Sequence, residues 1–569
     1  MKTNLRILFV FLAVIAFDSL VYAADPSAPG PLAVTREEYT FGDTAFAPTN
    51  FPGPVEVTAS VHYPTGLPGG PYPLVVFLHG RHATCFNGGS AFLEWPCKPP
   101  RVSLPSYQGY DYISQILASH GYIVVSISSN GINARDNFVF DLGAKARAEL
   151  IQHHLDLWNQ FNTTGGAPFG TKFVGKVDLT RVGTMGHSRG GEGVVRHFLL
   201  NASLGSPYGV KAVYPLAPVD FNRSVANNVP LAVMLPYCDG DVADLQGVHF
   251  YDDARYKVAG DPTAKHNVLV MGANHNFFNT IWTPGIFNAG SADDWNAFVL
   301  TGRSDSHCGV VKGNQRLTPE QQRAVGLAYI AGFFRNYLGG EDFAAQFTGD
   351  VPATPNQTFV MYQAPDLFTT RRDVNRLLTS ADLLTNTLGG DVSQNGITPY
   401  ELCGGEAPQP RFCLPLERNS RQPHTTPSAR SRGTRGLSQL QAGWLSTAAF
   451  IENDLPRGTR DVSTFRVLQF RASVNFADLR NSVGSPQNLD VVLTDRRNRS
   501  ALVRVSDVSG ALYYPPGEVI HVPKVLLNTI RVPLAGFKNI DLTDVVSVRF
   551  NFDRTNSGAL LISDIAFAN

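Results

Sequence analysis

The feature that most constrains this chain is a serine enclosed by glycines between an apolar strand and a helix. Val182–Met185 is a short apolar run, Gly186-His187-Ser188-Arg189-Gly190-Gly191 follows at once, and Val194–Leu200 continues as a helix candidate. A sharp strand-to-helix turn of this kind exposes the serine hydroxyl above the sheet. The flanking positions need glycine because the turn leaves no room for side chains. The pattern predicts that Ser188 acts as a nucleophile.

The first 340 residues alternate strand and helix candidates. Leu74–Leu78 is a continuous apolar run, as expected for a strand buried on both faces of a parallel sheet. The alternation predicts an α/β fold with a doubly wound, mostly parallel sheet. The other strand candidates are Val55–Tyr63, Tyr122–Ile127, Val210–Tyr214, Leu231–Leu235 and Asn267–Met271, and the main helix candidates are Tyr110–His120, Lys145–Phe161 and Pro319–Leu338.

The pattern changes after about Gly340. Short β-type runs separated by turn residues predict an all-β sandwich, and the last of them resemble the strands of a jelly roll. With 569 residues the chain is too long for one core. We expect a catalytic domain over 24–345 and a β-sandwich accessory domain over 346–569. The β-type runs are Thr358–Tyr362, Thr464–Phe476, Leu489–Leu493, Ala501–Val505, Thr529–Pro533, Val545–Phe552 and Leu560–Phe567.

Residues 1–23 have the features of a secretory signal peptide. Lys2 and Arg6 precede an apolar run, Ile7–Phe17, and Val21-Tyr22-Ala23 offers a small-residue cleavage site. The alternative is an N-terminal membrane anchor, which Asp18 and the short apolar run disfavour. We expect a secreted or periplasmic protein whose mature chain has no transmembrane segment.

Six cysteines fit an exported chain, because disulfides form in oxidising compartments. Sequence alone leaves fifteen pairings open. Cys85 with Cys97, and Cys403 with Cys413, are local pairs that flank loops, which leaves Cys238 with Cys308. A bridge between the last two would hold the loop after Leu231–Leu235 near the region that follows His275.

The charge balance excludes one class of partner. Lys plus Arg and Asp plus Glu both number 47, so the chain has no net field that would favour nucleic acid. No cofactor is expected. Carbohydrate or surface binding by the C-terminal domain and a purely structural role for it stay open as alternatives.

A serine nucleophile needs a base, and the base needs an orienting carboxylate. In a nucleophile-elbow fold both follow the serine in chain order, each after a later strand. Leu231–Leu235 runs into Asp239-Gly240-Asp241, and Asn267–Met271 runs into Gly272-Ala273-Asn274-His275. His275 is therefore the predicted general base. Asp239, with Val242 three residues on, is the preferred acid, and Asp241 is the alternative.

An oxyanion needs two backbone N–H donors. Arg189, the residue after the nucleophile, supplies one. Arg81, in the loop after Leu74–Leu78, is the predicted second donor. The spacing of His79 and His82 could also indicate a metal site, but nothing else nearby completes one, so no metal is predicted.

These residues resemble the α/β-hydrolase superfamily over roughly residues 50 to 340. The run Val75–Arg81, the serine turn with Arg189 after Ser188, Cys238–Val242 and Gly272–His275 carry the resemblance. Arg after the serine is similar to chlorophyllases. The short connections are similar to cutinase-like polyester hydrolases and to platelet-activating-factor acetylhydrolase-like enzymes. The resemblance implies hydrolysis of carboxylic esters through an acyl-enzyme.

The expected function is thus a secreted serine esterase that acts on a small-molecule or polymeric ester. A prolyl-oligopeptidase-like peptidase is the enzymatic alternative, although no acidic pair indicates a site for a substrate amine. The other alternative is a non-catalytic binding protein on a hydrolase scaffold, which the complete set of Ser188, Asp239 and His275 disfavours.

Overall fold

The computed structural model describes residues 25–289, 294–295, 304–311, 315–351, 358–404, 413–414, 437–518 and 523–569. The predicted signal peptide, residues 1–23, lies outside these residues.

A nine-stranded mixed sheet forms the centre of the first part of the chain. The five neighbouring pairs from β7 to β11 are parallel. The pairs β1–β2, β2–β7 and β11–β12 at the two ends are antiparallel. In sheet order the strands are β1 (Val34–Thr40), β2 (Thr58–Pro64), β7 (Ile123–Ile127), β3 (Tyr72–Leu78), β8 (Val177–His187), β9 (Val210–Leu216), β10 (Leu231–Pro236), β11 (Lys265–Val270) and β12 (Thr358–Gln363).

Helices cover both faces of this sheet. α3 (Ala144–Thr163) and α4 (Arg189–Ser203) pack together on one face, and α1 (Asp111–Ser119) and α7 (Pro319–Tyr337) pack together on the other. Strand β3 serves both cores, because successive side chains of a strand point to opposite faces. Its Leu74, Val76 and Leu78 belong to the core with α3 and α4, whereas Val75 and Phe77 belong to the core with α1 and α7.

Short elements complete this part of the chain. A small antiparallel sheet lies between β3 and α1, and the Cys85–Cys97 disulfide closes the loop that contains two of its strands. The short elements are β4 (Cys85–Asn87), β5 (Ser90–Phe92), β6 (Val102–Ser103), α2 (Asn130–Asn133), α5 (Val248–Ala254) and α8 (Ala344–Thr348).

Two antiparallel sheets make up the C-terminal part of the chain. They face each other across one shared hydrophobic core. Phe470 of one sheet and Phe550 of the other meet there, with ring centroids 4.6 Å apart. One sheet has the order β15 (Ile397–Cys403), β16 (Gln439–Trp444), β23 (Gly558–Ala568), β18 (Val467–Val474) and β21 (Asn528–Pro533), with β13 (Arg371–Asn375) also on β23; the other has the order β14 (Val392–Asn395), β17 (Phe450–Asp454), β22 (Val545–Asn551), β19 (Asp490–Asp495) and β20 (Ser500–Arg504).

Strand β12 lies beyond the predicted domain boundary at residue 345. Its residues, Thr358–Gln363, pair antiparallel with β11 and form the last strand of the nine-stranded sheet, although they fall inside the predicted β-sandwich range 346–569. An edge strand has the same apolar and β-branched composition whichever sheet it joins. Composition could therefore predict the strand but not its partner.

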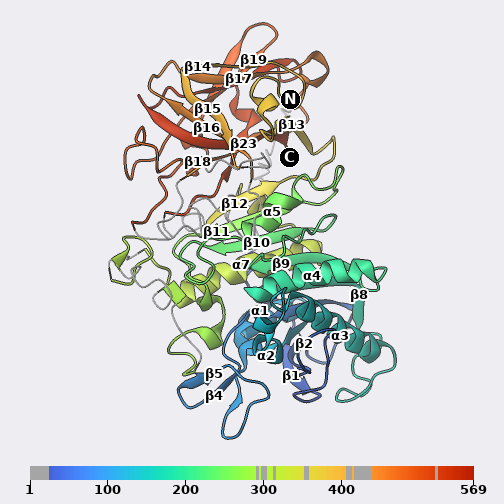
Figure 1. Cartoon of the computed structure of the whole chain (residues 1–569). Helices are drawn as coiled ribbons and strands as arrows, with labels where there is room; N and C mark the ends of the chain where they lie inside the picture. Colours follow the sequence, from blue (N-terminus) through green and yellow to red (C-terminus); the bar gives the residue numbers. More distant parts are fainter. Residues whose placement is uncertain are drawn as a thin grey trace, which may run out of the picture.

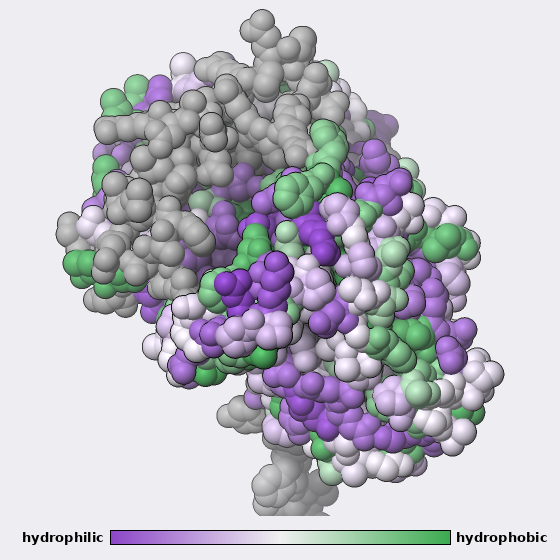
Figure 2. Space-filling model, turned by 60° about the horizontal axis from the view of Figure 1, so that its bottom comes forward, coloured by the Kyte–Doolittle hydropathy of each residue, from purple (hydrophilic) through white to green (hydrophobic). Residues whose placement is uncertain are grey.

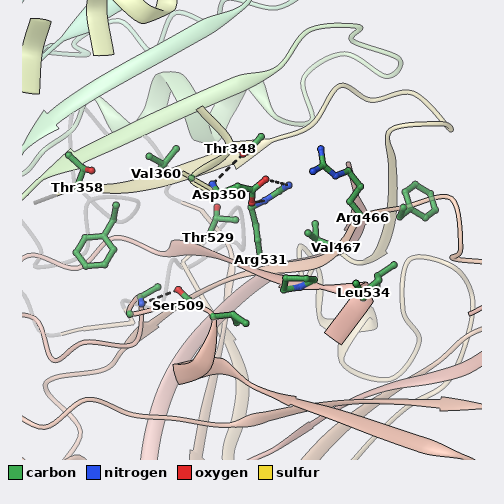
Figure 3. A pocket seen from close by; sticks show the side chains of 18 of the residues that line it. Thr348, Asp350, Thr358, Val360, Arg466, Val467, Ser509, Thr529, Arg531 and Leu534 are labelled. Atoms are coloured by element: carbon green, nitrogen blue, oxygen red, sulfur yellow. Dashed lines mark hydrogen bonds and ion pairs between the residues drawn. The ribbon is translucent and has the colours of Figure 1, made fainter. Parts of the chain in front are cut away.

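The C-terminal sheets lie beyond the β12 edge of the central sheet (Figure 1). A cavity of about 1140 Å³ is lined by β12 and parts of these sheets, and the Asp350–Arg531 ion pair, 2.8 Å long, lies in its wall (Figure 3). Strands β9, β10 and β11 separate β12 from β8 in the sheet. Because Ser188 directly follows β8, this cavity is not the site of the predicted nucleophile.

The surface is mixed in character. Figure 2 shows hydrophilic and hydrophobic residues interspersed over the described part of one face. Among the described residues, none of the helices combines the length and apolar character that crossing a membrane requires.

Candidate active site

Ser188 occupies a strained turn between β8 and α4. Its backbone has φ 58° and ψ −124°, a left-handed conformation that costs a non-glycine residue about 1–3 kcal/mol. Two backbone hydrogen bonds hold the turn: Ser188 N donates to Leu216 O at 2.9 Å, and Gly191 N donates to Ser188 O at 2.8 Å. The neighbouring strand β9 therefore helps to fix the serine at the end of β8.

The glycines around Ser188 are required by close approach of the backbone. A Cβ on Gly186 would lie 2.0 Å from Gly190 O, and a Cβ on Gly190 would lie 2.5 Å from Leu78 O. Gly80, in the loop after β3, is equally tight, since its Cβ would lie 2.5 Å from Ser188 Cβ. The structure thus gives the steric reason for the spacing in the sequence and places residues 80 and 188 side by side.

The structure brings Asp239 and His275 together. Asp239 follows β10 and His275 follows β11, and the carboxyl ends of these parallel strands meet at one edge of the sheet. His275 Nδ1 lies 2.8 Å from Asp239 Oδ2. The other carboxylate oxygen of Asp239 accepts from Asp241 N at 2.9 Å and Val242 N at 2.6 Å. Both side chains are buried, so the carboxylate holds the imidazole in one orientation.

Asp241 lies on the other side of the imidazole. Its Oδ2 is 3.5 Å from His275 Nε2, and 49% of its side chain is exposed. Asp241 therefore faces the nitrogen that Asp239 leaves free, rather than competing for Nδ1.

Asp294 joins the two loops that carry Asp239 and His275. It is buried, and its Oδ2 accepts from Gly240 N at 2.7 Å while its Oδ1 accepts from Asn276 N at 3.1 Å. One carboxylate thereby fixes the backbone beside the acid and beside the histidine. No signal in the sequence marks Asp294, because the residues that donate these two hydrogen bonds are more than fifteen positions away.

Three carboxylates control the charge of His275. Burial alone would lower the pKa of His275, but Asp239, Asp241 and Asp294 outweigh burial and raise the pKa to about 9. An imidazolium is favoured where opposite charges lie close by. Below this pH the histidine is mostly protonated in the free protein.

His187, directly before Ser188, packs on His275. Their ring centroids are 4.9 Å apart, and His187 Nε2 lies 3.0 Å from the His275 carbonyl oxygen. The Tyr110 hydroxyl is 2.9 Å from His187 Nδ1. Burial holds the pKa of His187 well below its usual value, so its ring is neutral and can donate from Nε2 to the carbonyl. This contact places the serine turn against the histidine loop.

The side chains of Arg81 and Arg189 converge on one buried carboxylate. Asp136 accepts from Arg81 Nε at 3.2 Å, from Arg189 Nη1 at 2.8 Å and from the buried Arg147 at 2.8 Å. Arg189 begins α4, where the first N–H groups have no partner within the helix. Asp136 therefore links the two residues whose amides are the predicted oxyanion donors, and the three guanidinium groups leave an excess of positive charge beside Ser188.

The three disulfides of the structure pair the cysteines as Cys85–Cys97, Cys238–Cys308 and Cys403–Cys413. The second joins the residue before Asp239 to a segment that follows His275. Cys238, Cys308 and His307 form a compact group of metal-ligand type among the described residues. Because the two sulfurs are bonded to each other, this group cannot supply thiolates to a metal.

The sheet order and the strained serine at the end of β8 define an α/β-hydrolase. Residues 104–283 match the family model described as PET hydrolase-like, and the chain is an ester hydrolase of this α/β type, similar to cutinase-like polyester hydrolases. Ser188, Asp239 and His275 lie within the matched range, whereas Arg81 and the C-terminal sheets lie outside it. A search of curated proteins found no match.

Proposed function

We propose that this chain is a secreted or periplasmic serine hydrolase that cleaves carboxylic esters through Ser188, His275 and Asp239. The observation that carries the proposal is the 2.8 Å contact between Asp239 and His275 at the sheet edge where the strained Ser188 stands. The three disulfides support export, since disulfides persist in oxidising compartments.

In the proposed mechanism, His275 Nε2 takes the proton of Ser188 as its hydroxyl oxygen attacks the ester carbonyl carbon. Asp239 holds the protonated imidazole in place. His275 then gives the proton to the leaving alcohol as the carbon–oxygen ester bond breaks. Water, activated by the same histidine, attacks the acyl-enzyme, releases the carboxylic acid and restores Ser188.

The backbone N–H groups of Arg81 and Arg189 hold the oxyanion in this proposal. Asp136 supports the assignment because its carboxylate forms ion pairs with the side chains of both residues. The positive charge that remains on the arginines stabilises the same developing negative charge. Asp136, like Asp294, thus acts by placing groups that contact the substrate.

A polyester is the substrate that the PET hydrolase-like match favours. Beside Asp136, the loop residues Phe138 and Phe140 are 79% and 86% exposed. Exposed aromatic side chains of this size beside a site suit contact with an extended apolar chain. We therefore propose a polymeric or oligomeric ester in preference to a peptide, which the alternative peptidase would need.

We propose that the C-terminal sheets form an accessory domain with the predicted jelly-roll-like architecture. Since β12 belongs to the central sheet, the proposed catalytic domain extends to residue 363 in place of 345.

A phosphonate ester with a p-nitrophenyl leaving group tests the proposed function. Ser188 Oγ should attack phosphorus and expel p-nitrophenolate, giving one label per chain on the peptide that contains Ser188. Esterase activity on p-nitrophenyl acetate should fall in step with labelling, and protein unfolded beforehand should not react. Labelling of another residue, or full activity after labelling, would contradict the proposal.

The pH dependence follows from His275. Because only the neutral imidazole can accept a proton, kcat/KM for a soluble ester should rise with pH to a plateau, with a midpoint near 9. The folded pKa is above the unfolded value, so the stability that this histidine contributes is complete below about pH 6.5 and is lost as pH rises through 9. Rate profiles and thermal unfolding between pH 6 and 10 measure both effects. A midpoint at or below 6.5 would refute the role of the three carboxylates.

A further inference from the structure

A segment of the C-terminal part of the chain, between β20 and β21, reaches the loop that carries Asp239. Tyr237, two residues before Asp239, is buried, and its hydroxyl donates to Pro516 O at 2.9 Å. The same hydroxyl accepts from Lys524 N at 2.9 Å. Tyr237 belongs to the acid loop, the loop after β10 that carries Asp239. It is thus hydrogen-bonded to two residues of the segment between β20 and β21.

Lys524 makes the most direct contact with the acid. Its Nζ donates to the main-chain carbonyl of Asp239 at 2.8 Å, and only 2% of the residue is exposed. The ammonium group also lies 5.4 Å from the ring centroid of Trp295. Burying an ammonium group is costly unless dipoles and opposite charges surround it. Here the Asp239 carbonyl and the buried carboxylate of Asp244 compensate the charge.

A second contact connects the segment between β20 and β21 to the Cys238–Cys308 disulfide. Glu518 N donates to Asp305 Oδ2 at 2.6 Å, and the other oxygen of Asp305 accepts from Cys308 N at 2.7 Å. Cys308 is bonded to Cys238, the residue directly before Asp239. The C-terminal segment therefore contacts this loop directly at Tyr237 and Asp239, and indirectly, through Asp305 and the disulfide, at Cys238.

Buried ion pairs hold the C-terminal sheets against the part of the chain that contains the central sheet. Arg471 of β18 pairs with Asp252 of α5 at 2.8 Å, and Asp564 of β23 pairs with Arg255. All four side chains are at most 5% exposed. Ion pairs this deeply buried resist separation, because parting them would leave unpaired charges in the interface.

We propose that Lys524 is a positioning residue of the catalytic triad and that the C-terminal domain is in this way part of the active site. The proposal rests on the proposed function. Lys524 holds the main chain at Asp239, and Asp239 orients His275, so loss of the ammonium group displaces the acid rather than the substrate. The effect should fall on kcat and leave KM nearly unchanged.

Lys524 also balances the charge around His275. The groups that face this histidine are the carboxylates of Asp239, Asp241 and Asp294 and the rings of His82 and His187, whose pKa values burial lowers. Lys524 brings a buried positive charge to the same loop. Without it, the carboxylates should hold the proton on His275 more strongly.

The test compares Lys524→Met with Lys265→Met in the full-length chain. Lys265 is a matched control: it is 1% exposed, its Nζ donates to Val229 O at 2.8 Å, and it stands at the start of β11, the end remote from His275. Both substitutions should lower the melting temperature. Only Lys524→Met should lower kcat on p-nitrophenyl acetate, by about 10- to 100-fold at constant KM, and move the midpoint of the pH profile upward. Lys524→Arg, which keeps the charge, should recover part of the rate.

Tyr237→Phe supplies a second variant should Lys524→Met not fold. It removes the hydroxyl that joins the acid loop to Pro516 and Lys524 without changing charge, so kcat should fall several-fold with an unchanged pH midpoint. The proposal is overturned if Lys524→Met matches Lys265→Met in kcat and pH midpoint, or if a folded Tyr237→Phe keeps the full rate. Phosphonate labelling of the wild type separates this outcome from failure of the proposed function, which would leave Ser188 unlabelled.

Discussion

Replacing Ser188 with alanine is expected to lower kcat on p-nitrophenyl acetate by about 10⁵- to 10⁶-fold. The substitution removes the oxygen that would form the acyl-enzyme, and neither His275 nor Asp239 can replace it. The β-carbon stays, so the strained turn at φ 58° and its hydrogen bonds to Leu216 and Gly191 should be kept. The melting temperature and the KM for the substrate should therefore change little, while kcat falls.

Ser203→Ala is the matched control for Ser188→Ala. Ser203 ends the same helix, α4, is exposed, and its hydroxyl donates to Leu200 O at 2.7 Å. Its loss should leave kcat at the wild-type value. A Ser188→Ala protein that retains a rate within tenfold of the wild type would refute the proposed nucleophile.

A run of apolar residues, rather than burial alone, decides which strands could be predicted from the sequence, since the largely buried β16 is not among the predicted strands. The central strands β3, β10 and β11 are buried along their whole length, and their continuous apolar runs were recognisable. Strand β1 was missed because it is an edge strand with mostly polar, partly exposed residues. Strand β14, Val392–Asn395, is missed for the same reason, since it is polar and mainly exposed. Such strands are fixed by pairing with a neighbour, which leaves little trace in composition.

Chain order explains which parts of the site could be predicted. Asp239 and His275 each follow a recognisable strand, so topology alone places them near Ser188. Asp294 and Lys524 have no such position, because folding brings them to the acid loop from distant segments. Asp136 likewise looks like an ordinary surface aspartate in the sequence, although it is fully buried among three arginines. Residues that position the proposed catalytic groups are visible only in the three-dimensional arrangement.

Asp239→Asn is expected to lower kcat by about 10³- to 10⁴-fold. An asparagine that offers its NH₂ group to His275 Nδ1 favours the wrong tautomer, in which Nε2 carries the proton and cannot accept one from Ser188. The amide also loses the negative charge that stabilises the imidazolium formed during attack. Because the side chain keeps its shape, Asp241 N and Val242 N can still donate to an oxygen at this position, and the fold should survive.

Asp241→Asn, unlike Asp239→Asn, should keep most of the activity. The two variants together therefore show which aspartate is the acid of the triad. Asp241 faces Nε2 at 3.5 Å and is half exposed, so its removal should keep the plateau value of kcat within about threefold, since solvent screens an exposed charge. With one of the three carboxylates gone, the pKa of His275 should fall and the midpoint of the kcat/KM profile should move to lower pH. Full pH profiles of both variants on the same soluble ester make the comparison. Loss of activity in Asp241→Asn together with full activity in Asp239→Asn would make Asp241 the acid. Loss of activity in Asp239→Asn, with an active Asp241→Asn whose kcat/KM midpoint moves to lower pH, would mean that Asp239 orients His275 and that Asp241 raises its pKa.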